Sequence, residues 1–228
     1  MIYDRLAYYY DELVKDDEAT LKWCDFVDRH SKKRKILELA CGSGEISHEL
    51  MQRGYEILAT DISASMLARL NQKYPNINTK VLDMNEFKVS QQYDGIICFC
   101  DSINYLENYH QMFASVHEAL KIGGTFLFDM HSKDRLEEFK EMFIEEGYIN
   151  DTPYQWTIVS DENCIHQHFT FYQPEGMIQE QHVQYVFEPK EVMTYLEALG
   201  FKLKVYTDFD QEGIQPGEKI FIVGEKLR

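Results

Sequence analysis

Five short apolar runs, each followed by a stretch with helical periodicity, occupy the chain from residue 35 to about residue 131. Two neighbouring parallel strands must be joined by a long crossover connection, which is usually a helix. Regular alternation of this kind is typical of an open parallel sheet with helices on both faces. We therefore expect an α/β fold with a doubly wound, mostly parallel sheet, whose strands lie at residues 36–39, 56–60, 79–82, 95–99 and 125–128.

The pattern changes after about residue 150. Turn sequences join three segments that are rich in β-forming residues, and this arrangement predicts an antiparallel meander at residues 154–160, 165–172 and 177–187. No helical segment separates the last two predicted strands, residues 201–208 and 219–224. We expect these two strands to be antiparallel neighbours at the edge of the sheet.

Composition excludes several classes of protein. The formal net charge of −16 repels a phosphate backbone, so general binding to nucleic acid or to an anionic membrane is not expected. The five cysteines form no Cys-x-x-Cys pair, which favours reduced thiols over a disulfide framework or a zinc site. We see no signal segment and no apolar run of transmembrane length, and expect a soluble cytoplasmic protein.

A glycine-bearing turn, Cys41-Gly-Ser-Gly44, follows the first predicted strand and opens a helix. Strand, glycine turn and helix form a unit in which a ligand approaches bare backbone at the carboxyl end of a strand. Because ligands of open α/β sheets bind at these ends, carboxylates located there should converge on one crevice. These carboxylates are Glu38, Asp61, Asp83 and Asp101.

The charge of this crevice discriminates between two nucleoside ligands. A dinucleotide would bring a pyrophosphate to the turn, where Glu45 would repel it, and Ser47 occupies the third glycine position. S-adenosylmethionine has no phosphate, and its sulfonium and ammonium suit an acidic crevice. Asp61 follows Gly42 by about 20 residues, the separation at which an acidic residue accepts the ribose hydroxyls. Asp83 is placed to accept from the amine of the base. We expect S-adenosylmethionine as the cofactor, with an NAD(P)-dependent oxidoreductase as the weaker alternative.

Five segments, in this order, resemble the motifs of a known family. Residues 36–44, Ile-Leu-Glu-Leu-Ala-Cys-Gly-Ser-Gly, resemble motif I of the class I S-adenosylmethionine-dependent methyltransferases. The segments that resemble the later motifs are 60–63 with Met66, 81–84, 93–106 and 120–126. The resemblance covers about residues 35–130 and implies a Rossmann-like methyltransferase fold with a seven-stranded sheet whose last strand is antiparallel.

The opening segment, residues 3–11, is similar to the N-terminal segment of a small-molecule branch of this family. In that branch, a tyrosine near the position of Tyr10 and the Asp that follows help to cover the cofactor. The same aromatic residues, Tyr8, Tyr9 and Tyr10, also fit a core-facing stripe on a helix. The sequence leaves both interpretations open, a lid over the ligand and a core-facing element.

The resemblance also implies roles for single residues. Glu38 and the backbone of residues 41–44 would hold the methionine end of the cofactor, Asp61 would bind the ribose, and Asp83 would bind the adenine amine. The implied cofactor-binding residues are Tyr10, Glu38, Ala40, Cys41, Gly42, Gly44, Asp61, Ile62, Met66, Asp83, Met84, Cys100, Asp101 and Tyr105. Ala40 stands where the family usually has a glycine, a change that should be tolerated if this residue has a negative φ.

The implied reaction is an in-line displacement, in which an N, O or C nucleophile attacks the sulfonium methyl group. Holding the reacting atoms in line supplies much of the acceleration. Residues 100–104 lack the Pro-Pro-aromatic signature of methyltransferases that act on base amines or glutamine, so we expect a small-molecule methyl acceptor. A general base is needed only if the nucleophile arrives protonated. The candidates for it are His131, Asp101, Tyr105 and Asp129.

The predicted meander carries further polar and aromatic residues. His166, His168 and His182 complete no evident ligand set with a carboxylate or a cysteine, so we expect no metal. A second group either lines an acceptor pocket or packs the meander onto the sheet, and consists of Trp156, His168, Tyr172 and Tyr185.

These observations predict one methyltransferase domain of 228 residues, as a monomer or a homodimer. Its expected parts are an N-terminal helical lid (1–34), a cofactor-binding core (35–150), an antiparallel β insertion that covers the substrate (151–188), and a last helix with an edge hairpin (189–228). A catalytically silent S-adenosylmethionine-binding regulatory protein would carry the same cofactor motifs, so that alternative also stays open.

Overall fold

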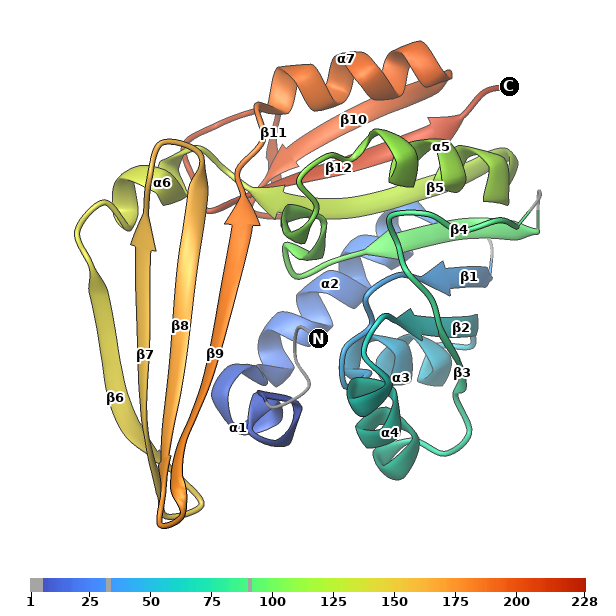
Figure 1. Cartoon of the computed structure of the whole chain (residues 1–228). Coiled ribbons are helices and arrows are strands. Elements are labelled where there is room, and N and C mark those ends of the chain that lie inside the picture. Colours follow the sequence, from blue (N-terminus) through green and yellow to red (C-terminus); the bar gives the residue numbers. More distant parts are fainter. Residues whose placement is uncertain (1–5, 32–33, 90–91) are drawn as a thin grey trace.

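A central sheet of eight strands organises the structure, which is a computed structural model that describes residues 6–31, 34–89 and 92–228. The strand order is β11-β10-β12-β5-β4-β1-β2-β3 (Figure 1). The strands are β1 (Lys35–Glu38), β2 (Glu56–Asp61), β3 (Asn78–Val81), β4 (Tyr93–Cys98), β5 (Leu120–His131), β10 (Phe201–Thr207), β11 (Gln211–Glu212) and β12 (Lys219–Lys226).

Helices cover both faces of this sheet, because its central strands alternate between two hydrophobic clusters. In β1, Ile36 packs with residues of α2 (Asp17–His30), α3 (Glu45–Gln52) and α4 (Ala64–Lys73). The next residue, Leu37, packs with residues of α5 (His110–Ala119) and α7 (Pro189–Leu199). Both residues are fully buried, as expected for a parallel strand covered on two sides.

The expected α/β fold is confirmed, with the first five strands parallel and the last strand, β12, antiparallel to both of its neighbours. The pair β10 and β12 is antiparallel, as predicted, but β12 lies between β5 and β10 and not at the edge. The two-residue strand β11 accounts for the eighth strand in a sheet expected to have seven.

Local signals in the sequence set the ends of the helices. Ser63 caps α4 by accepting a hydrogen bond from the backbone N of Met66 at 3.3 Å. Pro189 occupies the first turn of α7, and Gly200 ends that helix with a left-handed φ of 103°. Helix α5 ends at Ala119, before the two glycines that follow, because β5 already begins at Leu120.

A second, four-stranded antiparallel sheet stands beside the carboxyl ends of the central parallel strands (Figure 1). Its strands are β6 (Phe143–Ile149), β7 (Thr152–Ser160), β8 (Cys164–Gln173) and β9 (Gly176–Tyr185). Three of them match the predicted meander. The first was not predicted, so this sheet begins at Phe143 and not near residue 151, and α6 (Asp134–Glu138) connects it to β5.

The N-terminal segment lies between the two sheets and comprises η1 (Leu6–Tyr8) and α1 (Tyr10–Val14). Tyr9 is buried, and its ring stacks on Phe171 of β8 with a centroid separation of 4.1 Å. The hydroxyl of Tyr9 accepts a hydrogen bond of 2.6 Å from the side chain of Gln173. Tyr8 is 63% exposed. Of these aromatic residues, Tyr9 therefore belongs to the core of the second sheet.

Candidate active site

A cavity of about 430 Å³ lies where the carboxyl edge of the central sheet meets the second sheet. Its walls come from α1 and α2, the glycine turn after β1, the loop after β4, the end of β5 and the inner face of the second sheet. This volume is within the range of small-molecule sites. The predicted site residues that line it are Glu38, Ala40, Cys41, Gly42, Cys100, Asp101, Tyr105 and His131.

The glycine turn has left-handed backbone at three positions. The φ values are 53° at Ala40, 55° at Gly42 and 91° at Gly44. The condition of a negative φ at Ala40 is therefore not met, and this alanine holds a conformation that costs an L-residue about 1–2 kcal/mol. At Gly44, a Cβ atom would come within 2.5 Å of the Leu70 side chain, so glycine is required there for close packing of α4.

Asp61 holds this turn closed from the end of β2. Its Oδ2 accepts a hydrogen bond of 2.9 Å from the backbone N of Gly42, and its Oδ1 accepts one of 2.8 Å from the backbone N of Ser63. Burial raises the pKa of Asp61, and the backbone hydrogen bonds oppose this shift. The carboxylate is thus oriented beside the glycine turn, although it does not itself line the cavity.

Glu38 is the most deeply buried acid of the glycine turn region, with 3% of its surface exposed. The hydroxyl of Ser47 donates a hydrogen bond to it. Burial raises the pKa of Glu38 to about 8, and the carboxylates of Glu45 and Asp61 add to the shift. A cation placed in this part of the cavity would reverse that shift, so the group of acids fits the ammonium and sulfonium of S-adenosylmethionine.

Two consecutive left-handed residues, Cys100 with φ 57° and Asp101 with φ 50°, form the loop after β4. Asp129 of β5 supports this loop by accepting a hydrogen bond of 2.6 Å from the backbone N of Asp101. Its other oxygen accepts one of 2.7 Å from the indole N of Trp23. Burial raises the pKa of Asp129 to about 7. With both oxygens occupied, Asp129 holds the strained loop in place.

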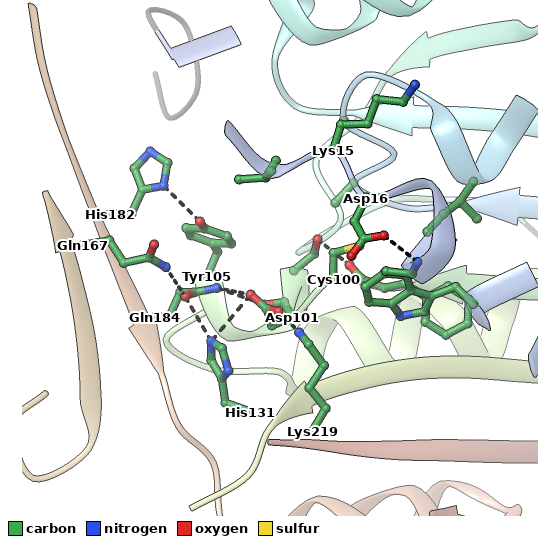
Figure 2. Close-up of a pocket in the computed structure, with 18 of the residues that line it drawn as sticks. Lys15, Asp16, Cys100, Asp101, Tyr105, His131, Gln167, His182, Gln184 and Lys219 are labelled. Carbon is green, nitrogen blue, oxygen red and sulfur yellow. Dashed lines mark hydrogen bonds and ion pairs between the residues drawn. The ribbon is translucent and has the colours of Figure 1, made fainter. Parts of the chain in front are cut away.

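The side chain of Asp101 is at the centre of a polar network (Figure 2). Its Oδ1 is paired with Lys219, and its Oδ2 accepts a hydrogen bond of 2.7 Å from Nε2 of Gln184. Because a carboxylate only accepts, the amide of Gln184 turns its Nε2 toward Asp101 and its Oε1 away from it. This Oε1 lies 3.0 Å from Nε2 of His131 and 2.6 Å from Nε2 of Gln167.

His131 enters this network as a donor. Its Nε2 faces the oxygen of Gln184, so in the neutral ring Nε2 carries the proton. Burial lowers the pKa of His131 to about 4, which keeps the ring neutral near pH 7. Nδ1 is buried and has no hydrogen-bond partner among the residues that the structure describes.

The second sheet supplies the far wall of the cavity. Trp156 of β7 stacks on Phe169 of β8 with a centroid separation of 5.2 Å, and its indole N donates a hydrogen bond of 3.1 Å to Gln167. His182 of β9 contacts Tyr105, and both line the cavity. Sequence reasoning missed several lining residues, namely Trp23, Gln167, Phe169, Gln184 and Lys219.

Strand alternation explains which of the predicted aromatic residues line the cavity. Trp156 does, whereas His168, Tyr172 and Tyr185 are not among the lining residues. The strand register places these three on the face of the second sheet opposite to that of Trp156. The period-two pattern of β8 and β9 was the available signal for the missed residues, since 167 and 169, like 182 and 184, share a face.

The predicted adenine contacts lie beside the cavity and not in its wall. Ile62 is 45% exposed, Met66 is buried in its helix, and Met84 packs against the cluster around α5. Asp83 is exposed, and its Oδ1 accepts a hydrogen bond of 2.8 Å from the backbone N of Asn85. Of the four acids that were expected to converge, Glu38 and Asp101 therefore line the cavity, Asp61 lies beside the glycine turn, and Asp83 is exposed outside the cavity. The Tyr10 side chain lies outside the described residues.

Among residues 6–31, 34–89 and 92–228, no group of three or more His, Cys, Asp and Glu side chains is arranged to hold a metal ion. No described helix has the length and apolar character needed to span a membrane.

Comparisons with known proteins bear on what the cavity binds. A family described as a methyltransferase domain matches residues 36–124. YqeM of Bacillus subtilis, which carries the name of a methyltransferase, is 32% identical over 100% of this chain and 98% of its own length. The structure of an S-adenosylmethionine-dependent methyltransferase from Clostridium acetobutylicum has a TM-score of 0.81 at 21% identity and covers 98% of each chain. The sugar N-methyltransferase KedS8 from a Streptoalloteichus species has a TM-score of 0.77 at 19% identity and covers 100% of this chain and 94% of its own.

Proposed function

The chain belongs to the class I S-adenosylmethionine-dependent methyltransferase superfamily, and on this premise we propose that it methylates a small polar molecule held between its two sheets. It is a methyltransferase, and S-adenosylmethionine is its cofactor. When bound, the cofactor supplies an electrophilic methyl carbon and a thioether leaving group. We assign its methionine end to Glu38 and the backbone of residues 40–42, and its ribose to Asp61.

The proposal rests on one observation: a single cavity extends from the glycine turn to the second sheet. One wall contains Glu38 and Gly42 of the glycine turn, and the opposite wall contains Trp156 and Gln167 of the second sheet. A cofactor in the glycine turn would therefore present its methyl group to the part of the cavity that the second sheet encloses, which we call the chamber. We assign this chamber to the methyl acceptor and the second sheet to the role of substrate cover.

The walls of the chamber favour a neutral or cationic acceptor with hydrogen-bonding groups. The stacked rings of Trp156 and Phe169 offer an apolar face to a sugar or a small ring. Gln167 supplies an amide that is already oriented by its neighbours. The charge of Asp101 is compensated by Lys219. KedS8, which is named a sugar N-methyltransferase, has the same fold. By analogy, this likeness supports an amine as the methyl acceptor.

A panel of amino sugars, amino acids and phenols tests the proposal. Purified protein is incubated with S-adenosylmethionine and each compound, and S-adenosylhomocysteine and the methylated product are measured by mass spectrometry. We expect turnover with at least one amine. Absence of transfer to every compound, by protein that binds the cofactor in calorimetry, would contradict the proposal.

A matched pair of variants tests the position of the acceptor. Gln167→Ala removes an amide from the inner face of β8, whereas His168→Ala changes the next residue on the outer face. We expect Gln167→Ala to raise the KM for the acceptor about 10-fold, the effect of about one lost hydrogen bond. The dissociation constant of the cofactor should not change. Equal kinetics in the two variants would place the acceptor elsewhere.

A further inference from the structure

Three side chains in hydrogen-bond contact lead from the cavity wall into the second sheet. The phenol oxygen of Tyr105, in η2 (Ser102–Tyr105), lies 3.0 Å from Nδ1 of His182 (Figure 2). Nε2 of the same ring lies 2.9 Å from Oε1 of Glu180. Because Glu180 and His182 are two residues apart on β9, both side chains are on the inner face of that strand.

The chemistry of the three groups determines where the protons lie in these hydrogen bonds. The carboxylate of Glu180 can only accept, so Nε2 of His182 carries a proton and donates it. In the neutral ring Nδ1 is then bare, and it accepts the hydroxyl proton of Tyr105. Tyr105 therefore has its own proton directed toward His182 and presents oxygen lone pairs to the rest of its surroundings.

We propose that Tyr105, His182 and Glu180 form a proton relay that takes the proton of the methyl acceptor, and that the acceptor nucleophile is therefore an amine or a hydroxyl. This inference rests on the proposed function. Tyr105 would be the catalytic group, since it lines the cavity. His182 and Glu180 act through Tyr105 and are positioning residues, in the way that a carboxylate orients and stabilises a catalytic imidazole.

Atoms and charges balance in this step. The lone pair of the nucleophile forms the bond to the methyl carbon, and the electron pair of the broken carbon–sulfur bond stays on sulfur. The N–H or O–H bond of the nucleophile breaks, and its proton passes to the oxygen of Tyr105 as the phenol proton passes to Nδ1 of His182. The resulting imidazolium faces the Glu180 carboxylate, which stabilises its charge. After the product leaves, Nδ1 returns its proton to Tyr105 as the phenol releases a proton to water in the cavity, and this restores the starting state with the proton on Nε2.

The surroundings of His182 support a shielded relay. Its side chain is 1% exposed, and its ring lies 5.3 Å from that of Phe169. Tyr105 of η2 and Glu180 of β9 both contact this ring. A carboxylate acceptor has no proton to give to Tyr105 and would therefore not use the relay.

His131, the alternative base, is placed less well for this role. Its Nε2 proton points to Gln184, and its Nδ1 is buried. Burial also leaves the ring a weak base. We therefore assign His131 to the positioning of Gln184 and, through it, of Asp101.

The tautomer of His182 tests the relay without any acceptor. Protein labelled with ¹⁵N-histidine and loaded with S-adenosylhomocysteine is examined by long-range ¹H–¹⁵N NMR, and His182→Gln identifies the signal. We expect the tautomer with the proton on Nε2. A proton on Nδ1 instead would overturn the relay, because Nδ1 could not then accept from Tyr105.

Kinetics with the amine identified by the panel give a second test. We expect Tyr105→Phe to lower kcat by about 100-fold, a typical contribution of a positioned proton acceptor. Glu180→Gln and His182→Gln should lower kcat in the same direction, and the double variant Tyr105→Phe/His182→Gln should be no slower than Tyr105→Phe alone. Additive losses, or no loss in Tyr105→Phe, would overturn the relay.

Control variants separate the relay from general damage. Glu146→Gln and His168→Gln make the same changes on the outer face of the second sheet and should leave kcat unchanged. If no compound of the panel is methylated, the result counts against the proposed function. The tautomer of His182, measured without an acceptor, still tests the relay in that case. The two failures are therefore distinguishable.

Discussion

The hydroxyl of Ser43 donates a hydrogen bond of 2.6 Å to Oδ1 of Asp11, and this contact joins the N-terminal helix α1 to the glycine turn. Asp11 also accepts from Lys73 at 2.8 Å and from Arg69 at 3.3 Å, both on α4. Burial alone would raise the pKa of Asp11, but the hydrogen bonds from Lys73, Ser43 and Arg69 outweigh it and lower this pKa. These contacts fasten α1, which lines the cavity, to the glycine turn and to α4, and we propose that α1 acts as a lid over the cofactor.

Loss of this fastening should speed release of the cofactor. We expect Asp11→Ala to raise the dissociation rate of S-adenosylmethionine about 10-fold, since a hydrogen bond to a charged group contributes about 1.5–3 kcal/mol. Stopped-flow displacement measures this rate. Asp17→Ala is the control, because Asp17 is 81% exposed. An unchanged rate in Asp11→Ala would show that α1 does not act as a lid.

Ala40 offers a test of backbone strain at the site. Its φ of 53° is unfavourable for alanine and accessible to glycine. We expect Ala40→Gly to raise the free energy of unfolding by about 0.5–1 kcal/mol, because relief of strain exceeds the added entropy of the unfolded chain. Urea denaturation measures the change. Gly44→Ala is the opposite control, since its Cβ would clash with Leu70, and a loss of stability in Ala40→Gly would refute the strain at this position.

Burial of Glu38 predicts how the stability of the cofactor-free protein depends on pH. The folded pKa of about 8 is above the ordinary value of 4.5, so the folded state binds the proton more tightly than the unfolded state. The stabilisation is complete below pH 4.5 and is lost progressively as pH rises from 4.5 to about 8, by about 5 kcal/mol in all. Glu38→Gln should flatten this dependence in denaturation curves at several pH values. Glu56→Gln, at an exposed site, should leave it intact, and equal curves for wild type and Glu38→Gln would contradict the assignment.

The same shift predicts that cofactor binding releases a proton from Glu38. A cation beside the carboxylate favours its ionised form, so near pH 7 a proton leaves as S-adenosylmethionine binds. Calorimetry in buffers of different ionisation enthalpy counts the protons, and Glu38→Gln corrects for titration of the ligand itself. If wild type and variant release equal numbers of protons, Glu38 is not beside the bound cation.

The fold was predictable because the signals for it are local. An apolar segment such as residues 36–39, followed by a turn and a segment with helical periodicity, predicts a parallel sheet when the pattern repeats along the chain. The positions of Glu38, Asp61 and Asp101 follow from the same logic, since each stands at or just past the end of a strand.

The remainder of the site depends on tertiary contacts that no local pattern specifies. Alternation along β9 groups His182 with Gln184 but does not say that this face meets Tyr105 and Asp101. Asp83 follows the edge strand β3, and it is exposed there and does not line the cavity. How the second sheet docks on the central one decides these positions.

A crystal structure of the complex with S-adenosylhomocysteine tests the central claim most directly. We expect the amino acid end of the ligand beside Glu38 and Gly42, the ribose hydroxyls within hydrogen-bond distance of Asp61, and the thioether sulfur facing the chamber that Tyr105 lines. A ligand bound outside this cavity, or with its sulfur turned away from Tyr105 and the second sheet, would contradict the account.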